Sequence, residues 1–148
     1  MIELYKPNVD DLWFKEKMMS DKDTMSYNHG TIAFPVSKWD SWYQRWMNDN
    51  KHFYRYICGD DTFVGEVAYY LDSERGIYIA DVIIYAPYRG KGYGHKGLSM
   101  LCEYAKNNDI KELYDDIAID NPSINLFLKH GFKEALRTDE YVLVKKKL

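Results

Sequence analysis

The chain has 148 residues, a length that suits one domain with a sizeable hydrophobic core. Its net charge of -3 and its pI of about 5.8 give no electrostatic reason to expect a nucleic-acid partner. No apolar run approaches the roughly 20 residues that span a bilayer, and the first residues do not resemble a secretion signal. We therefore expect a protein without a membrane partner.

Cysteine and aromatic content narrow the class further. Cys58 and Cys102 lack metal-ligand spacing, and no pattern of His, Cys or carboxylate residues suggests a metal site. Two such cysteines are typical of reduced thiols in a cytoplasmic protein. Aromatic residues make up 16% of the chain, with Tyr 14 and Trp 4. They could line a pocket or fill the core, and exposed ones would favour a homodimer.

The N-terminal third is predicted to contain a strand and two helices. The strand is Ile2 to Tyr5, and Asn8 can cap the helix that follows. Residues 26–34 form an irregular segment, after which Ser37 and Asp40 resemble a capping box for the second helix. That helix carries an aromatic stripe at helical spacing, which indicates a core face that could also wall a pocket: Trp39, Trp42, Tyr43, Trp46 and Met47.

The remainder alternates short strands and helices joined by turns of ordinary length. Strands are predicted at residues 53–58, 63–71, 77–85, 113–119, 132–136 and 141–144, and helices at 93–107 and after Asn121. We find no repeat, linker or low-complexity segment. The pattern predicts one α+β domain over residues 1–148, with a mixed, mostly antiparallel sheet of about seven strands flanked by about four helices.

A basic, glycine-rich turn between the strand at 77–85 and the following helix is the most informative stretch. Pro87 ends the strand, and helical spacing begins before Leu98. Helix-start N–H groups, close backbone approach at glycine and two cations together make a phosphate site. The turn consists of Arg89, Gly90, Lys91, Gly92, Tyr93 and Gly94. A turn that merely ends a strand is the simpler alternative, and it explains the combination less well.

A dinucleotide site is a second interpretation of this turn. Gly92, Gly94 and Gly97 satisfy the G-x-G-x-x-G fingerprint, and an acidic cluster at Asp115, Asp116 and Asp120 follows at about the expected 20 residues. However, only roughly 50 residues remain after Gly97, too few for a complete dinucleotide-binding fold. The preceding strands also look antiparallel. We therefore disfavour a nicotinamide dinucleotide.

The longer motif resembles the GNAT N-acetyltransferase superfamily. Arg89 to Gly94 fits its pattern Arg/Gln-x-x-Gly-x-Gly/Ala, and Asp81–Pro87 and Asn121–Phe132 fit its fourth strand and last helix. The resemblance implies a GNAT-like fold in which the six residues of the turn hold the pyrophosphate of acetyl-CoA. It also implies that strand four separates from strand five and binds the rest of acetyl-CoA through the backbones of Ile83, Ile84 and Tyr85. Further contacts would come from Asn121, Asn125 and Phe127, although Asn121 could simply cap a helix.

Two carboxylates are candidate catalytic residues. Asp81 interrupts an apolar strand, where a carboxylate is costly unless it is paired or functional. Burial would raise its pKa and make it a better base, and the position matches a common acidic base of GNAT enzymes. Glu66 on the neighbouring strand could share the cavity. The alternatives are a salt bridge from Asp81 to Arg55 or Arg75, and a solvated, outward-facing Glu66.

The resemblance is incomplete at the leaving group. GNAT enzymes often place a tyrosine four residues before the glycine of a Gly-Phe pair, and here that position is Phe127, which cannot donate a proton. Tyr114, His130, water or unaided departure remain open. The acceptor amine would be drawn by the two carboxylates and enclosed by aromatic side chains, for which we single out Tyr27, Tyr69, Tyr70 and Trp39.

These observations predict an N-acetyltransferase that moves the acetyl group of acetyl-CoA to a primary amine on a small molecule or a protein. Direct attack in a ternary complex is expected, because neither cysteine lies where an acyl carrier would be obvious. The alternative is an acyl-CoA-binding sensor or interaction module that has lost turnover. Phe127 favours the sensor, and Asp81 favours the enzyme.

Overall fold

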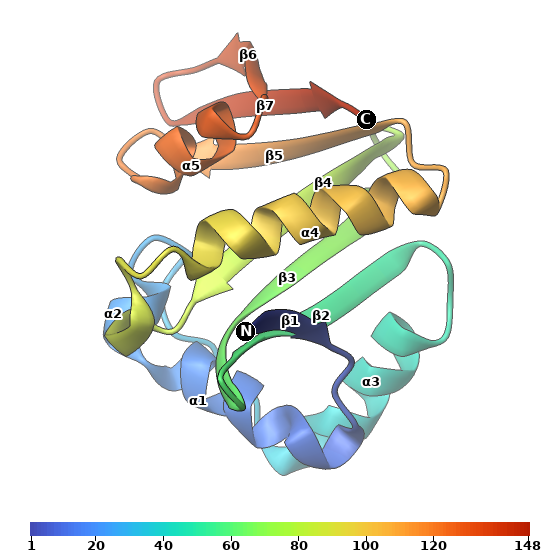
Figure 1. Cartoon of the computed structure of the whole chain (residues 1–148), viewed down its shortest axis with the longest axis vertical. Helices are drawn as coiled ribbons and strands as arrows, with labels where there is room; N and C mark the ends of the chain where they lie inside the picture. Colours follow the sequence, from blue (N-terminus) through green and yellow to red (C-terminus); the bar gives the residue numbers. More distant parts are fainter.

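One seven-stranded sheet forms the centre of the computed structural model, which describes residues 1–148 (Figure 1). Neighbouring strands are antiparallel except β4 and β5, which are parallel, and the order is β1-β2-β3-β4-β5-β7-β6. The strands are β1 (Ile2–Tyr5), β2 (His52–Gly59), β3 (Thr62–Asp72), β4 (Ile77–Ile84), β5 (Glu112–Ala118), β6 (Lys133–Arg137) and β7 (Tyr141–Lys147).

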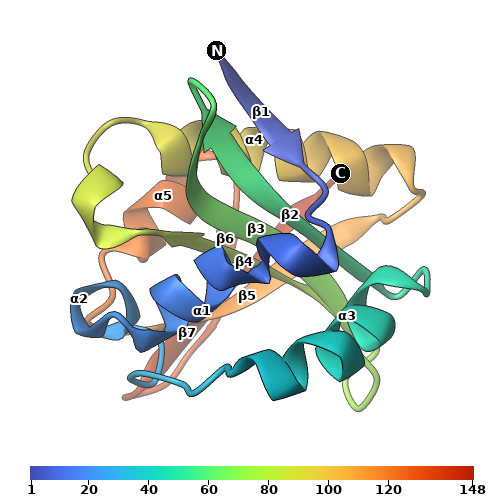
Figure 2. The same cartoon turned by 90° about the horizontal axis from the view of Figure 1, so that it is seen from below.

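Helices cover both faces of the sheet, as Figure 2 shows. The five α-helices are α1 (Trp13–Ser20), α2 (Lys22–Met25), α3 (Trp39–Met47), α4 (Tyr93–Asn107) and α5 (Ser123–Lys129), with short 3-10 helices at Val9–Leu12, Val36–Lys38 and Ala86–Tyr88. The first three α-helices lie on one face, and α4 and α5 lie on the other. None of the helices has the length and apolar character that crossing a membrane requires.

The predicted α+β class and the seven mostly antiparallel strands are confirmed. There is one more α-helix than expected, because Asp21 has an extended backbone (φ -88°, ψ 118°) and separates α1 from α2. Asp21 then caps α2 by accepting a hydrogen bond from the Thr24 N–H. The capping box expected at Ser37 and Asp40 is wrong, because Ser37 lies inside the 3-10 helix that precedes α3.

Two hydrophobic cores hold these layers together, one on each face of the sheet. Beneath α4, Leu98, Leu101 and Ala105 are fully buried against the sheet. Beneath α1 and α3, Leu12, Met18 and Tyr56 are fully buried, and most partners of this second core are aromatic. The predicted stripe on α3 therefore does face a core, although Trp42 alone of its tryptophans is buried.

The two parallel strands separate soon after they meet. The pairing of β4 with β5 is confined to Ile79 and Tyr114, whereas β5 pairs with β7 along its whole length. β4 meanwhile stays paired with β3 as far as Ile84. The far half of β4 thus has no partner on its β5 side, and an opening runs through the sheet.

Candidate active site

A cavity of about 720 Å³ occupies this opening between β4 and β5. Its walls come from both helical layers, since Lys15 and Trp42 lie on one side of the sheet and Leu126 and Phe127 on the other. Asp81 of β4 and other acidic side chains of β5 line the part between them. A cavity of this shape can admit a long, narrow ligand from one face of the sheet and a second molecule from the other.

The unpartnered edge of β4 presents backbone groups to this cavity. The Tyr85 N–H donates to the Val64 carbonyl at 2.9 Å. Because bonding groups alternate along an antiparallel strand, Ile83 also directs its backbone toward β3, while Ile84 directs its N–H and C=O toward the open side. The expectation for Tyr85 needs correction, since its carbonyl is also engaged, by the Tyr88 N–H at 2.8 Å.

The glycine-rich turn leads into α4 at one end of the cavity. Gly92 precedes the helix with φ of 86°, a left-handed conformation that favours glycine, and no side chain caps the helix. The first backbone hydrogen bond of the helix runs from the Lys96 N–H to the Gly92 carbonyl. The N–H groups before Lys96 therefore have no acceptor within the helix. Free N–H groups beside Lys91 make the predicted anion site physically sound.

Arg89 has a different environment from the other cation of the turn. Its Nη2 donates to the carbonyls of Asp23 and Thr24, both at 3.1 Å, so the guanidinium fastens α2 to the turn. The fully buried Thr24 adds a second link, because its Oγ1 accepts a hydrogen bond from the Ala86 N–H at 2.9 Å. Arg89 also lines the cavity, and its two hydrogen bonds hold α2 beside the turn.

Asp81 lies half-buried on the cavity wall and forms no ion pair. Burial raises the pKa of its carboxyl to about 6, the negative charge of Glu66 adds to the shift, and Lys15 opposes it. The alternative of a salt bridge is wrong, because Arg75 pairs with Asp72 and Asp116 instead. Arg55 lies on the opposite face of the sheet, where its guanidinium covers the Phe53 ring.

Asp115 of β5 is a buried carboxylate in the same cavity, and it was not among the predicted site residues. Burial raises the pKa of Asp115 well above its usual range, and the charge of Asp81 contributes to the shift. The sequence holds a signal for it, since Asp115 takes the inward position between Leu113 and Ile117, both fully buried. A carboxylate at such a position, like Asp81, is costly unless it is paired or functional.

Glu66 is buried but is not free to act as a base. The Lys15 ammonium lies 3.2 Å from its Oε1, and the Tyr54 hydroxyl donates to the same oxygen. The ammonium also lies over the rings of Trp42 at 5.0 Å and Tyr54 at 4.8 Å. The predicted proton-accepting role of Glu66 is thus less favoured than that of Asp81, because an internal cation already neutralises the Glu66 charge.

Two of the four predicted acceptor-binding aromatics lie on the cavity wall, and two do not. Tyr70 and Tyr27 line it, and burial raises the pKa of Tyr70 to about 12. Tyr69 points to the other face of the sheet, as alternation along β3 requires, and its hydroxyl accepts from Asn108 at 2.9 Å. Trp39 donates from Nε1 to the Phe34 carbonyl at 3.0 Å, and Trp42 and Trp46 line the cavity instead.

The α5 candidates divide between structural and cavity positions. Asn121 accepts a hydrogen bond from the Ser123 N–H at 2.9 Å just before α5, whose N-cap residue is Pro122, and it also lines the cavity. Asn125 is exposed beyond the cavity. Phe127 is buried, packs edge-on against Phe132 and forms part of the wall.

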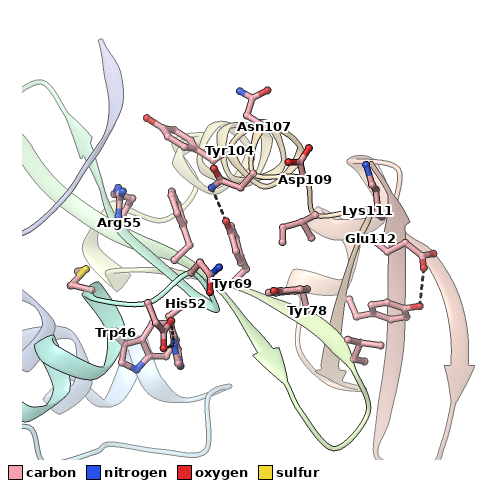
Figure 3. A pocket seen from close by; sticks show the side chains of 18 of the residues that line it. Trp46, His52, Arg55, Tyr69, Tyr78, Tyr104, Asn107, Asp109, Lys111 and Glu112 are labelled. Carbon is pink, nitrogen blue, oxygen red and sulfur yellow. Dashed lines mark hydrogen bonds and ion pairs between the residues drawn. The ribbon is translucent and has the colours of Figure 1, made fainter.

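A second cavity, of about 920 Å³, lies at the opposite end of the sheet between α3 and the end of α4 (Figure 3). Tyr69 and Tyr78 line it, and so does Tyr114, whose hydroxyl donates to Glu112 at 3.5 Å. It contains neither the glycine-rich turn nor the open edge of β4, so it does not fit the predicted chemistry. Tyr114 is thereby removed as a proton donor for the first cavity.

His130 is also a poor candidate for the proton donor. Its Nε2 lies 3.1 Å from Nδ1 of His95, so the two rings share a hydrogen bond. Burial lowers the pKa of His130, and the neighbouring His95 and Lys146 lower it further. It does not line the cavity, and a neutral histidine there contributes no acid.

Comparison with known proteins agrees with this geometry. The model of the acetyltransferase (GNAT) family matches residues 15–132, most of the chain. The chain therefore belongs to the GNAT acetyltransferase family, and the resemblance noted in its glycine-rich turn and last helix is confirmed.

Solved structures share the whole fold at low sequence identity. A spermidine N-acetyltransferase from Vibrio cholerae, in complex with CoA and spermine, has a TM-score of 0.86 at 17% identity, over 99% of this chain and 95% of its own. The yncA protein of Salmonella typhimurium, with acetyl-CoA, has a TM-score of 0.80 at 15% identity, over 100% of this chain and 94% of its own. The PaiA N-acetyltransferase of Thermoplasma acidophilum, with coenzyme A, has a TM-score of 0.76 at 16% identity, over 100% of this chain and 99% of its own.

Proposed function

We propose that the protein is an N-acetyltransferase that transfers the acetyl group of acetyl-CoA directly to a primary amine. The observation that carries this proposal is the single cavity that passes between β4 and β5 and holds Asp81 beside an open backbone edge. Family membership and the coenzyme A complexes of the similar structures support acetyl-CoA as the co-substrate.

Binding of acetyl-CoA would use the groups already described. The N–H groups at the start of α4 and Lys91 hold the pyrophosphate, and the helix dipole adds to their attraction. The pantetheine arm lies along the open edge of β4, between that strand and α5. Acetyl-CoA supplies the activated acetyl thioester, and the Ile84 N–H is the donor that stabilises charge on the thioester oxygen during attack.

The acceptor enters from the side of the sheet that α1 and α3 cover. Asp81 and Asp115 attract its ammonium group, and Tyr70 and Trp42 enclose it. The Asp81 carboxylate takes the proton, directly or through one water, and the neutral amine attacks the thioester carbon. The carbon–sulfur bond then breaks, and the products are an acetamide and the coenzyme A thiol.

The α5 residue at the position where GNAT enzymes often carry a tyrosine does not protonate the departing sulfur. Phe127 has no hydroxyl, and a free thiol has a pKa of roughly 8.5. We propose that the sulfur leaves as the thiolate or is protonated by water. A direct route without an acyl-enzyme is supported by the burial of Cys58 and Cys102, neither of which lines the cavity.

The acceptor class rests on charge. Besides Asp81 and Asp115, the cavity contains Glu140 and Asp116, the latter already paired with Arg75, so an amine that is cationic in water suits it better than a neutral or anionic one. The Vibrio cholerae relative was crystallised with spermine, which places polyamines in the panel to be screened beside monoamines and protein N-termini.

The first experiment is calorimetry of the purified protein with acetyl-CoA and with NADH. Micromolar binding of acetyl-CoA that is lost in Gly92→Asp, with no binding of NADH, supports the proposal. An amine panel is then screened by mass spectrometry for a product heavier by one acetyl group. Tight binding of acetyl-CoA without any acetylated amine would favour the sensor, and binding of NADH instead would refute the acetyl-CoA site.

A further inference from the structure

The Lys15 ammonium, which lines the cavity, is surrounded by one carboxylate and three aromatic rings. The Lys15 ammonium lies 3.2 Å from the Glu66 carboxylate and over the rings of Trp42 at 5.0 Å, Tyr54 at 4.8 Å and Phe34 at 5.9 Å. We call these four groups, Glu66 and the three rings, the Lys15 cage. The Lys15 side chain is only 11% exposed, and that of Glu66 6%.

The cage has the chemistry that recognises a free primary ammonium. Aromatic faces attract cations through their quadrupoles, most strongly when water is excluded, and a buried carboxylate supplies the compensating charge. Its groups come from α3, the segment before α3, β2 and β3, and the lysine that they surround comes from α1. An amine acceptor presents the same ammonium group on the same kind of alkyl chain.

The cage is continuous with the acceptor side of the cavity. Lys15, Trp42, Tyr54 and Glu66 line the same cavity as Asp81, and the charge of Lys15 reaches the Asp81 carboxyl. Lysine is among the residues least often buried, and here it neutralises Glu66 at the site where a second ammonium of a substrate would be bound. Asp81 and Asp115 remain as carboxylates of the same cavity without a cationic partner.

We propose that the Lys15 cage is an ammonium subsite that the chain fills with its own lysine, and that Lys15 thereby excludes diamines that would place one ammonium there. This inference rests on the proposed function, because it takes the acceptor to be an amine bound at Asp81. An acceptor with one ammonium and a neutral tail fits the filled cage. A diamine meets the positive Lys15 head group and is disfavoured.

The test empties the cage and asks whether a diamine takes the vacant place. In Lys15→Met the alkyl stem is kept and the cation is lost, so Glu66 becomes available to a substrate ammonium. We expect kcat/KM for a series of α,ω-diamines of four to eight carbons, relative to the n-alkylamine of equal length, to rise at least about tenfold for the best-fitting chain. Lys22→Met, at an exposed position of α2, is the matched control and leaves this ratio unchanged.

A second variant guards against misfolding of the first, which leaves a buried carboxylate unpaired. Lys15→Met combined with Glu66→Gln removes both charges and keeps the aromatic walls. We expect it to fold and to lose the gain for diamines. Circular dichroism and the midpoint of urea unfolding establish the folded state of each variant before the kinetics are compared.

Calorimetry with the same diamines separates this inference from the proposed function. Tighter diamine binding to Lys15→Met without acetylation of any amine would support the cage while refuting the enzyme. Normal acetylation with a diamine-to-monoamine ratio equal to that of the unmodified protein, in kinetics and in binding, would overturn the cage. An equal rise of the diamine-to-monoamine ratio in the double variant would also overturn the cage, because it would show that Glu66 is not the group that binds the second ammonium.

Discussion

At the scale of single residues, Asp81 combines access to a cavity with a raised pKa of about 6, which a proton acceptor for an ammonium group requires. Asp81→Asn should lower kcat about 10²- to 10⁴-fold, the range typical of a lost general base. Binding of acetyl-CoA should not change, because Asp81 is not part of the turn. Steady-state kinetics and calorimetry measure the two effects, and Asp139→Asn, in an exposed turn, is the control.

The pH dependence of that activity follows from the same carboxyl group. Asp81 accepts a proton only when it is ionised, so kcat/KM should fall as the pH drops below about 6 and reach a plateau above it. The profile is measured with acetyl-CoA saturating and the amine below its KM. An acid limb that stays near pH 6 in residual Asp81→Asn activity would assign the titration to another group.

The buried carboxyl should also cost stability at high pH. The pKa of Asp81 is raised from 3.8 to about 6 in the folded protein, so the folded state binds the proton more tightly than the unfolded state. The free energy of unfolding therefore decreases as the pH rises through this interval and stays lower above it. Asp81→Asn should stabilise the protein by about 1–2 kcal/mol at pH 8 and by much less at pH 4.5, as urea unfolding measures.

At the scale of elements, the short helix α2 depends on contacts with the turn before α4, because it is too short to be stable alone. Four residues cannot form an independent helix. Besides the burial of Met25 in the core, α2 is held by the bond from the Ala86 N–H to Thr24 and the two bonds from Arg89. These bonds connect α2, and the segment of residues 26–34 that follows it, to the glycine-rich turn and the residues just before it. Binding of acetyl-CoA and order in that segment should therefore be coupled.

Thr24→Val tests this coupling with a side chain of the same shape. The half-buried Ala86 N–H loses its acceptor and Asp21 loses the hydroxyl donor of Thr24, which should cost about 1–3 kcal/mol of unfolding free energy and weaken acetyl-CoA binding several-fold. Denaturation and calorimetry give the two numbers. Thr31→Val, at an exposed loop position, should change neither. Loss of stability with unchanged affinity would show that α2 supports the fold but not the turn.

At the scale of the whole molecule, sequence reasoning recovered what local patterns encode. The helix Tyr93–Asn107 was predicted with its observed bounds, because the glycines before it and apolar residues at helical spacing within it are local signals. The carboxylate Asp81 was found because it breaks an apolar strand. Lys15 was not singled out, since its importance depends on Glu66, which lies fifty-one positions further along the chain and across two layers.

The errors have a common physical origin in the faces and edges of the sheet. Tyr69 was grouped with Tyr70 by adjacency, although neighbours on a strand point to opposite faces. The engagement of Tyr85 depends on its register with Val64, which short-range patterns do not specify. Where β4 leaves β5 is likewise set by tertiary packing, so the opening that makes the cavity required the structure.

That opening makes a prediction that belongs to the sheet as a whole. The Ile84 N–H faces the gap, whereas the Ile83 N–H belongs to the ladder with β3. In the free protein, the Ile84 amide should therefore exchange with solvent deuterium much faster than the Ile83 amide. Acetyl-CoA should slow exchange at Ile84 by at least about tenfold, because the bound thioester or pantetheine becomes its acceptor, while NADH should not. Residue-resolved hydrogen exchange by NMR measures both amides in one experiment. Equal protection of the two amides in the free protein would mean that the gap is closed in solution, and the proposed route of the pantetheine arm would then be wrong.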